Sequence, residues 1–275
     1  MNIETEIFLE LIYPKKGEDM ADCQDARCNN LDKNWDIKRF AVADGVSSSF
    51  FPAIFSQQLT EYFCCSNDPI NLQLFDKPEN WKKWLVNIQG NWLAEVAHEI
   101  KQTKKYYVRN RFYANDHAGA TFVGLEISRD NKGDGGYTWK AMIIGDSCLM
   151  HITNKNEFQS YLLKSSDDFN YTPKYFPSRY IVNNPYTPDF KTGKVSPNDI
   201  FFLATDAISK WILDAREKKD KNRFVKILPM GPEDILTTDD IDIYRNDKES
   251  PLENDDVAIL GIKILDSNEK ELIHE

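Results

Sequence analysis

The stretch Arg39-Phe40-Ala41-Val42-Ala43-Asp44-Gly45-Val46-Ser47-Ser48-Ser49 joins a short apolar run to an acidic residue, a glycine and three serines. The run from Phe40 to Ala43 has the length of a buried strand, so Asp44 is expected where the strand ends and a carboxylate can meet solvent or a metal ion. Gly45 permits backbone conformations closed to other residues and lets its carbonyl approach an ion closely. A strand that ends in an Asp-Gly turn is the simpler alternative, and the rest of the chain must decide between the two.

The composition is that of an ordinary folded domain. The chain has 275 residues, 41% of them hydrophobic and 28% charged, which allows a substantial core. No apolar run approaches the roughly 20 residues that span a bilayer, and the N-terminus lacks the basic start of a signal peptide. We therefore expect a cytoplasmic protein that does not associate with membranes. Because no linker divides the chain, we expect one domain over residues 1–275.

The charge and the cysteines limit the partners further. A net charge of −10 argues against nucleic acid, because the phosphate backbone would be repelled. The five cysteines are odd in number and contain no paired Cys-x-x-Cys arrangement, which argues against a disulfide framework or a structural zinc site. We interpret them as reduced thiols. The oligomeric state stays open.

Hydrophobic periodicity predicts a mixture of strands and helices. The strand at 3–13 is expected to pair with the next one across a polar working loop, and the four strands between 119 and 163 to form one antiparallel meander. Strands are predicted at 3–13, 36–44, 119–127, 137–144, 148–153, 157–163, 199–203 and 257–265. Helices are predicted at 50–65, from 80 to about 107, and onward from 208.

The segment 165–198 differs from its surroundings. It contains five prolines and several tyrosines without a clear period. So long an irregular segment inside a domain is typical of a lid, a binding loop or a disordered insertion. Its aromatic content favours an ordered flap.

Three acidic residues share a position relative to the predicted strands. Asp44 and Asp206 follow apolar strands, whereas Asp255 precedes one. Since antiparallel strands alternate in direction, these carboxylates can converge at one edge of a sheet. Such a cluster repels itself unless a hard divalent cation such as Mg²⁺ or Mn²⁺ is bound. Each aspartate alone is more often a cap or turn residue, and Asp206 suits the N-cap of the following helix.

The order of the short motifs resembles that of the metal-dependent protein serine/threonine phosphatases of the 2C type, in a bacterial-like variant. That family has an acidic motif, then Asp-Gly, Gly-x-Thr, Gly-Asp-Ser, Thr-Asp-Gly and finally Asp-Asn or Asp-Asp before the last strand. The corresponding residues here are Gln24-Asp25, Asp44-Gly45, Gly119-Ala120-Thr121, Gly145-Asp146-Ser147, Thr205-Asp206-Ala207 and Asn254-Asp255-Asp256. Each motif alone is a weak signal, but six in the right order between residues 24 and 260 are specific.

The resemblance implies an α+β fold, a four-layer α-β-β-α sandwich in which two antiparallel sheets are flanked by helices. The implied activity is hydrolysis of phosphoserine or phosphothreonine in a phosphoprotein substrate by a metal-activated water. The implied cofactors are two Mn²⁺ or Mg²⁺ ions. Asp44 would bridge both ions, the Gly45 carbonyl would bind one, Asp206 and Asp255 would complete the other, and Asp25 would orient a metal-bound water.

The sequence departs from the family pattern around a third, weaker ion that Asp146 can hold in the family. Gln24 stands where many members have a metal-binding glutamate, and Ala207 replaces the usual glycine. Lys210 lies near the position of another expected acidic ligand. We therefore predict a weakened third-metal site and an intact two-metal core.

The arginine that many family members use to hold phosphate is absent, because the equivalent residues are Asp19-Met20-Ala21-Asp22. Arg27, Lys15 or Lys16 are the candidates to replace it. These departures leave a second interpretation open, in which the chain is a catalytically weak relative that serves as a regulatory or phosphoprotein-binding module.

Overall fold

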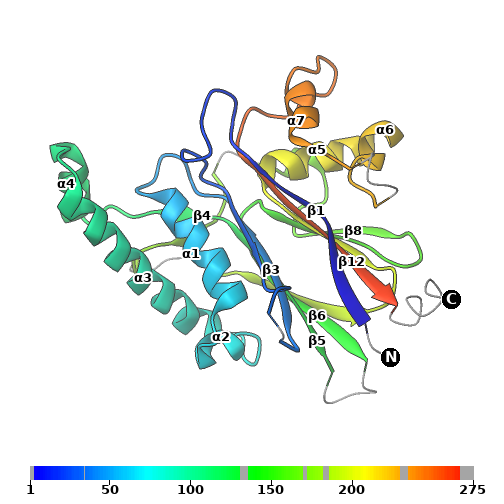
Figure 1. Cartoon of the computed structure of the whole chain (residues 1–275), viewed down its shortest axis with the longest axis horizontal. Helices are drawn as coiled ribbons and strands as arrows, with labels where there is room; N and C mark the ends of the chain where they lie inside the picture. The colour runs from blue at the N-terminus through cyan, green and yellow to red at the C-terminus, as the bar shows by residue number, and fades with distance from the viewer. Residues whose placement is uncertain are drawn as a thin grey trace.

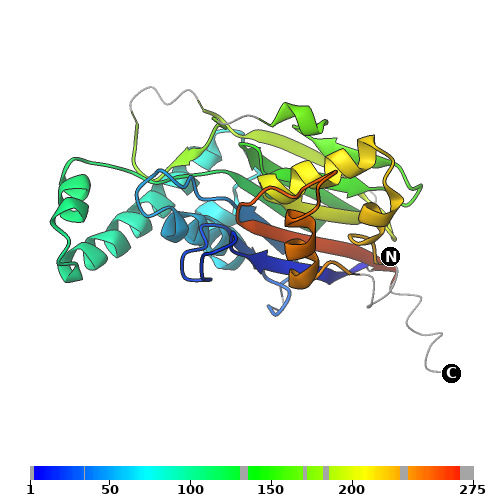
Figure 2. The same cartoon turned by 90° about the horizontal axis from the view of Figure 1, so that it is seen from above.

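Two antiparallel sheets lie face to face in the computed structural model (Figures 1 and 2), which describes residues 3–33, 35–130, 136–169, 172–181, 186–229 and 235–266. Helices α1 to α4 lie on the outer side of one sheet, and α5 to α7 on the outer side of the other. This confirms the four-layer α-β-β-α sandwich that the resemblance implied. None of the helices in the described ranges is long and apolar enough to cross a membrane.

The strands of each sheet come from both halves of the chain. In the described residues, one sheet has the strand order β1-β12-β11-β7-β8, the other has the order β10-β6-β5-β3-β2, and β4 pairs with β9. The strands are β1 (Ile3–Tyr13), β2 (Ala26–Asn29), β3 (Lys38–Ala43), β4 (Gly119–Ala120), β5 (Phe122–Arg129), β6 (Tyr137–Ile144), β7 (Cys148–Ile152), β8 (Phe158–Tyr161), β9 (Phe176–Pro177), β10 (Asp189–Val195), β11 (Ile200–Ala204) and β12 (Val257–Asp266).

The helices agree with the predicted periodicity where that was strong. The predicted helices at 50–65 and 80–107 correspond to α1 and to α3, and α4 follows α3 as a separate short helix. The helices are α1 (Pro52–Cys65), α2 (Pro69–Leu72), α3 (Asn80–Gln102), α4 (Tyr106–Tyr113), α5 (Asp206–Glu217), α6 (Lys221–Val225) and α7 (Thr238–Arg245), with a 3₁₀ turn at Ser166–Asp168.

The side chains of strand β3 alternate between two hydrophobic cores. Phe40 and Val42 face the core between the sheets, whereas Ala41 and Ala43 face the core under α1 and α3. All four are fully buried, so the strand reads as one apolar run. The small alanines leave room for the helices and for the buried rings of Trp84. A third core lies between the other sheet and α5.

A buried ion pair ties α1 and α2 to the second sheet. Arg39 on β3 lies opposite Glu126 on β5, and its Nη2 is 2.6 Å from Glu126 Oε2. The same guanidinium donates to the carbonyls of Phe63 and Asn71, at 3.2 and 3.0 Å. Because the pair is fully hydrogen-bonded, its burial is tolerated, but removal of one partner would leave a buried charge.

Two predicted strand pairings were wrong. Strand β1 pairs with β12 rather than with β3, so the first two predicted strands lie in different sheets. The predicted meander is also split, because β5 and β6 belong to one sheet and β7 and β8 to the other. The turn Gly145-Asp146-Ser147 therefore carries the chain from one sheet to its partner. Single-strand periodicity identifies a strand but does not say which neighbour it has.

Regular structure also occurs where none was predicted. Strand β2, which pairs with β3, lies in the stretch interpreted as a polar loop. In the segment 165–198, β10 forms an edge strand beside β6 and β9 pairs with β4. Phe176 of this segment is fully buried in the hydrophobic core that includes residues of α1 and α3. Residues 170–171 and 182–185 lie outside the described part of the chain, and a role of this segment as a flap stays a prediction.

Candidate active site

The predicted acidic residues lie at strand ends that the fold brings together. Antiparallel pairing of β11 with β12 sets Ala204 opposite Ile259, and the Thr205 amide donates to the Ala258 carbonyl at 3.0 Å. This places Asp206, just after β11, beside Asp255, just before β12. Asp44 arrives from β3 in the opposite sheet.

Electrostatic coupling shows that the carboxylates are close to one another. Burial raises the pKa of Asp44 to about 7, and the charges of Asp146 and Asp255 act in the same direction. Burial, followed by the charge of Asp44, also raises the pKa values of Asp25 and Asp206 well above the usual range. The structure therefore brings the predicted acidic residues close enough for their charges to repel one another.

Asp146 completes this group from the turn between the two sheets. It is 6% exposed, and burial followed by the charge of Asp255 raises its pKa to about 6. Gly145 makes the turn possible with φ of +92°, and a side chain there would meet Thr121. The Thr121 hydroxyl lies 2.6 Å from that of Ser147, so the Gly-x-Thr and Gly-Asp-Ser motifs hold each other.

Several oxygens of the cluster have no hydrogen-bond partner among the residues that the structure describes. They are Asp25 Oδ2, Asp146 Oδ1 and Gln24 Oε1, and all three atoms are buried. Buried carboxylate and amide oxygens without partners fit the ligand preferences of Mg²⁺ and Mn²⁺. Asp206 and Asp255 instead accept from the next backbone amide, Ala207 at 2.6 Å and Asp256 at 2.9 Å.

The ligand geometry itself is not formed. Within the described ranges, no group of three or more His, Cys, Asp or Glu side chains is arranged so that it could hold a metal ion. One oxygen of Asp206 and one of Asp255 accept from backbone amides, which leaves the second oxygen of each for another partner. The donor chemistry of the cluster therefore fits a divalent cation, although the side chains are not arranged around one.

Gly45 is required for space rather than for its backbone angle. Its φ lies outside the left-handed region, so the conformational freedom that glycine permits is not used here. A Cβ at this position would lie 2.8 Å from the Gln24 carbonyl oxygen and 2.9 Å from Pro52 Cβ. The Gly45 amide donates to that same carbonyl at 3.2 Å, and Ser56 Oγ donates to it at 2.6 Å. The Asp-Gly stretch is thus packed directly against the Gln24-Asp25 motif.

Asp256 is a residue whose role the sequence did not predict. Its Oδ2 accepts from the Gln24 amide at 2.7 Å and its Oδ1 from the Lys15 amide at 2.8 Å. These bonds tie the last strand to the loop that carries Asp25. Of the adjacent acids, Asp255 therefore faces the cluster while Asp256 positions the loop. The sequence does show two consecutive aspartates, Asp255 and Asp256, before the last strand, but it does not indicate which of the two side chains faces the acidic cluster.

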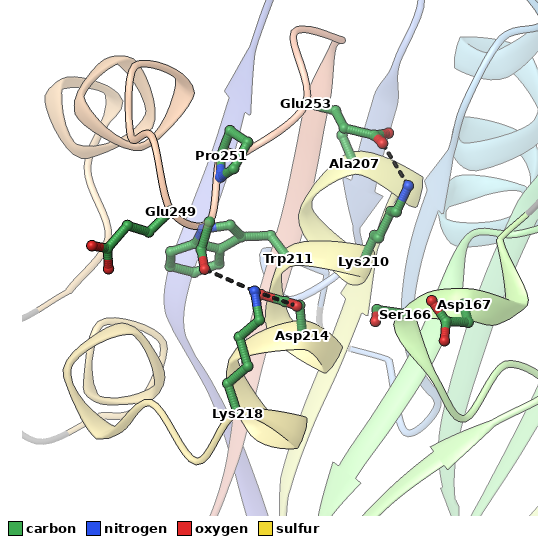
Figure 3. A pocket seen from close by; sticks show the side chains of 11 residues that line it. Ser166, Asp167, Ala207, Lys210, Trp211, Asp214, Lys218, Glu249, Pro251 and Glu253 are labelled. Atoms are coloured by element: carbon green, nitrogen blue, oxygen red, sulfur yellow. Dashed lines mark hydrogen bonds and ion pairs between the residues drawn. The ribbon is translucent and has the colours of Figure 1, made fainter.

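A cavity of about 320 Å³ opens along one side of α5 (Figure 3). Ala207 and Lys210 line it, and Lys210 Nζ lies 2.6 Å from Glu253 Oε1. Trp211, Pro251 and Lys218 form another part of the wall. The lysine predicted to weaken a third-metal site thus lies one turn beyond Asp206 and is held by an acid from the loop before Asp255.

The three candidate phosphate-binding cations differ in position. Arg27 forms an ion pair with Glu10, and Lys15 Nζ lies 3.1 Å from Glu18. Burial raises the pKa of Asp255, and the charge of Lys15 opposes that rise. Lys16 Nζ contacts Asn246 at 3.5 Å. The backbone amide of Lys15 donates to Asp256 Oδ1 at 2.8 Å, which places this lysine beside the residue that follows Asp255.

Comparison with solved structures finds this fold in serine/threonine phosphatases. The serine/threonine phosphatase of S. agalactiae is 13% identical, and the match covers 96% of this chain and 100% of that one with a TM-score of 0.55. The catalytic domain of the phosphatase PstP, in complex with two manganese ions, is 13% identical with the same coverage and a TM-score of 0.54. PppA, a regulatory component of T6SS in Pseudomonas aeruginosa, is 14% identical over 96% of this chain and 99% of its own, with a TM-score of 0.54. Comparison of the sequence with protein-family models and with curated proteins finds no match.

Proposed function

We propose that this chain, which has the fold of the metal-dependent serine/threonine phosphatases of the 2C type, is a phosphatase that acts on phosphoserine or phosphothreonine in a phosphoprotein. The observation that carries the proposal is the group of buried, mutually repelling carboxylates at the ends of β3 and β11 and the start of β12. Their raised pKa values mean that ionisation of these carboxyls is unfavourable in the metal-free protein, and a bound divalent cation would make it favourable.

The proposed cofactors are two Mn²⁺ or Mg²⁺ ions. Asp44 would be shared by both ions, the Gly45 carbonyl would serve one, and Asp206 and Asp255 would serve the other. When bound, such ions lower the pKa of a coordinated water toward ~7 and neutralise charge on the phosphoryl group. Metal binding requires ionised carboxylates, so we expect it to release protons from the carboxyls of the acidic cluster.

The remaining residues of the proposed site would orient the water and attract the substrate phosphate. We expect Asp25, which has one oxygen without a hydrogen bond in the described residues, to accept a hydrogen bond from a metal-bound water and to align it with the phosphorus. The buried Ser56 hydroxyl and the Gly45 amide fix the Gln24 carbonyl, and through it the Asp25 backbone. Lys15 is the side chain proposed to attract the substrate phosphate.

A third ion would bind weakly. Asp146 offers an unpartnered buried oxygen, but Ala207 and Lys210 supply no further acidic ligand at the start of α5. The ammonium of Lys210 instead adds positive charge beside Asp206. The proposed site therefore works with two ions.

The alternative function is a regulatory or phosphoprotein-binding module with little turnover. The specific observation in its favour is that, within the described ranges, no group of three metal-ligating side chains is arranged as a metal site, while one oxygen of Asp206 and one of Asp255 accept from neighbouring backbone amides. Such a module would bind a phosphopeptide without consuming it.

Hydrolysis of an aryl phosphate and of a phosphothreonine peptide, with Mn²⁺ titrated into metal-stripped protein, separates the two functions. We expect turnover that EDTA abolishes and that falls at least 100-fold in Asp206→Asn, since loss of a charged metal ligand removes both metal affinity and charge neutralisation. The exposed Asp22→Asn serves as a control of equal charge change. Phosphopeptide binding without metal-dependent turnover would favour the module instead.

A further inference from the structure

Helix α4 forms an exposed arm at one end of the molecule. It lies beside the far end of α3, well away from α5 to α7 (Figures 1 and 2). It has no fully buried residue, and its Tyr106, Tyr107 and Tyr113 are 77%, 62% and 74% exposed. Exposed tyrosines on this scale are typical of a contact surface rather than of an isolated surface helix.

The arm is basic in a strongly acidic chain. Residues 101–116 contain five basic residues and a single acidic one, whereas the whole chain has a net charge of −10. Lys101, Lys104, Lys105 and Arg109 are exposed, and in the described part of the chain none of the four forms an ion pair. This concentration of positive charge would attract an acidic partner and orient its approach.

A groove of about 630 Å³ separates α4 from the end of α3. Its apolar lining comes from Ala97, Ile100 and Phe112, and its charged lining from Lys101 and Arg109. No acidic side chain of the described residues lines it. An apolar groove with a basic edge fits a segment that alternates carboxylates with apolar side chains.

The arm is held in place at its C-terminal end. Arg179, from the segment between β9 and β10, donates to Asn115 Oδ1 at 3.0 Å and lies over the ring of Phe112 at 5.1 Å. Arg111 pairs with Asp116 at 2.5 Å and donates to the carbonyl of Ser48 at 3.5 Å. Since Ser48 belongs to the loop that follows Asp44-Gly45, the groove has a fixed position relative to the acidic cluster.

We propose that the α3–α4 groove docks an acidic peptide segment that carries apolar side chains, supplied by the phosphoprotein substrate and separate from its phosphorylated residue. The identification of the partner as a substrate rests on the proposed function, whereas the acidic chemistry of the docked segment does not. Lys101 and Arg109 would pair with its carboxylates, and Tyr106, Phe112 and Tyr113 would contact its apolar side chains. Docking at a distance raises the effective concentration of the phosphorylated residue at the site.

The binding test uses a short fluorescein-labelled peptide of glutamates and leucines, and a matching peptide in which lysine replaces every glutamate. We expect the acidic peptide to bind wild-type protein in preference to the basic one, and to bind Lys101→Glu/Arg109→Glu at least tenfold more weakly. Lys155→Glu/Lys221→Glu changes the net charge equally at exposed positions outside the arm and should bind like wild type. Equal loss in both double variants, or equal binding of the two peptides, would overturn the proposal.

The kinetic test appends the same acidic segment to a phosphothreonine peptide. We expect the segment to raise kcat/KM about tenfold for wild type and for the Lys155/Lys221 control, and not for Lys101→Glu/Arg109→Glu. Hydrolysis of a small aryl phosphate should be equal in all three proteins, which also shows that they are folded. Absence of aryl phosphate turnover in wild type, with the binding pattern intact, would refute the proposed phosphatase and leave the docking of acidic peptide standing.

Other occupants give different results. Binding of a thymidine oligonucleotide, or of vesicles containing an anionic lipid, that is lost in Lys101→Glu/Arg109→Glu while peptide binding is unchanged would replace the acidic peptide by that partner. A concentration-dependent dimer in light scattering that disappears in the same variant would show that a second copy of this chain occupies the groove.

Discussion

Replacement of Asp44 by asparagine should stabilise the metal-free protein while removing its activity. The pKa of Asp44 is raised from 3.8 to about 7 in the folded state, so ionisation is disfavoured there. A shift of about three pKa units corresponds to about 4 kcal/mol. In EDTA the contribution of Asp44 to the stability of the wild type is therefore most favourable below about pH 4 and is lost as the pH rises through the window to about pH 7. Asparagine has nearly the same shape and never ionises, so it avoids this cost.

The measurement is urea unfolding of both proteins in EDTA between pH 4 and pH 8. We expect the free energies of unfolding to be similar at pH 4 and the variant to be more stable by a few kcal/mol at pH 8. Addition of Mn²⁺ should then raise the Tm of the wild type and leave that of Asp44→Asn nearly unchanged. The exposed Asp22→Asn should show neither effect. A stability difference that does not depend on pH would refute the reasoning, because it would show that packing rather than charge determines the effect.

Three further changes test other parts of the structure. Glu126→Ala should cost about 3–5 kcal/mol in urea unfolding, because it leaves the Arg39 guanidinium buried without its partner, and Arg39→Met/Glu126→Leu should recover most of that loss. Gly45→Ala should lower phosphatase activity at least tenfold, because the new Cβ would lie 2.8 Å from the Gln24 carbonyl oxygen. The control is Gly90→Ala in α3, where a Cβ would have no atom within 4 Å. It should stabilise the protein by about 1 kcal/mol and leave the activity unchanged. Lys210→Asp should increase the number of Mn²⁺ ions bound in calorimetric titration by one, because it adds a carboxylate one helical turn beyond Asp206. An unchanged number would contradict the account of the third ion.

The strongly periodic parts of the chain were predictable because one face or both faces of each element are buried. The apolar spacing of Trp84, Ile88 and Trp92 predicted α3, and these residues are fully buried under it. The run from Phe40 to Ala43 predicted β3 for the same reason. Strand partners were less predictable, because the pairing of β1 with β12 joins the two ends of the chain and no local pattern records it.

The candidate site was predictable at the level of position and not of orientation. Strand ends predicted that Asp44, Asp206 and Asp255 would approach one another, and the structure places them so. It also turns Asp206 and Asp255 toward backbone amides, which depends on the cap geometry of α5 and of the last loop. The use of Asp256 as a tether for residues 15 and 24 likewise depends on a contact between chain ends.

The acidic cluster draws its members from both sheets, with Asp25 and Asp44 beside β2 and β3, and Asp206 and Asp255 beside β11 and β12. Repulsion between these charged carboxylates opposes the close approach of the two sheets at this edge. We expect a cation shared between them to hold the two sheets together there. Amide exchange at the ends of β3 and β11 would then slow together on metal binding, so that the site and the sandwich would open as one unit.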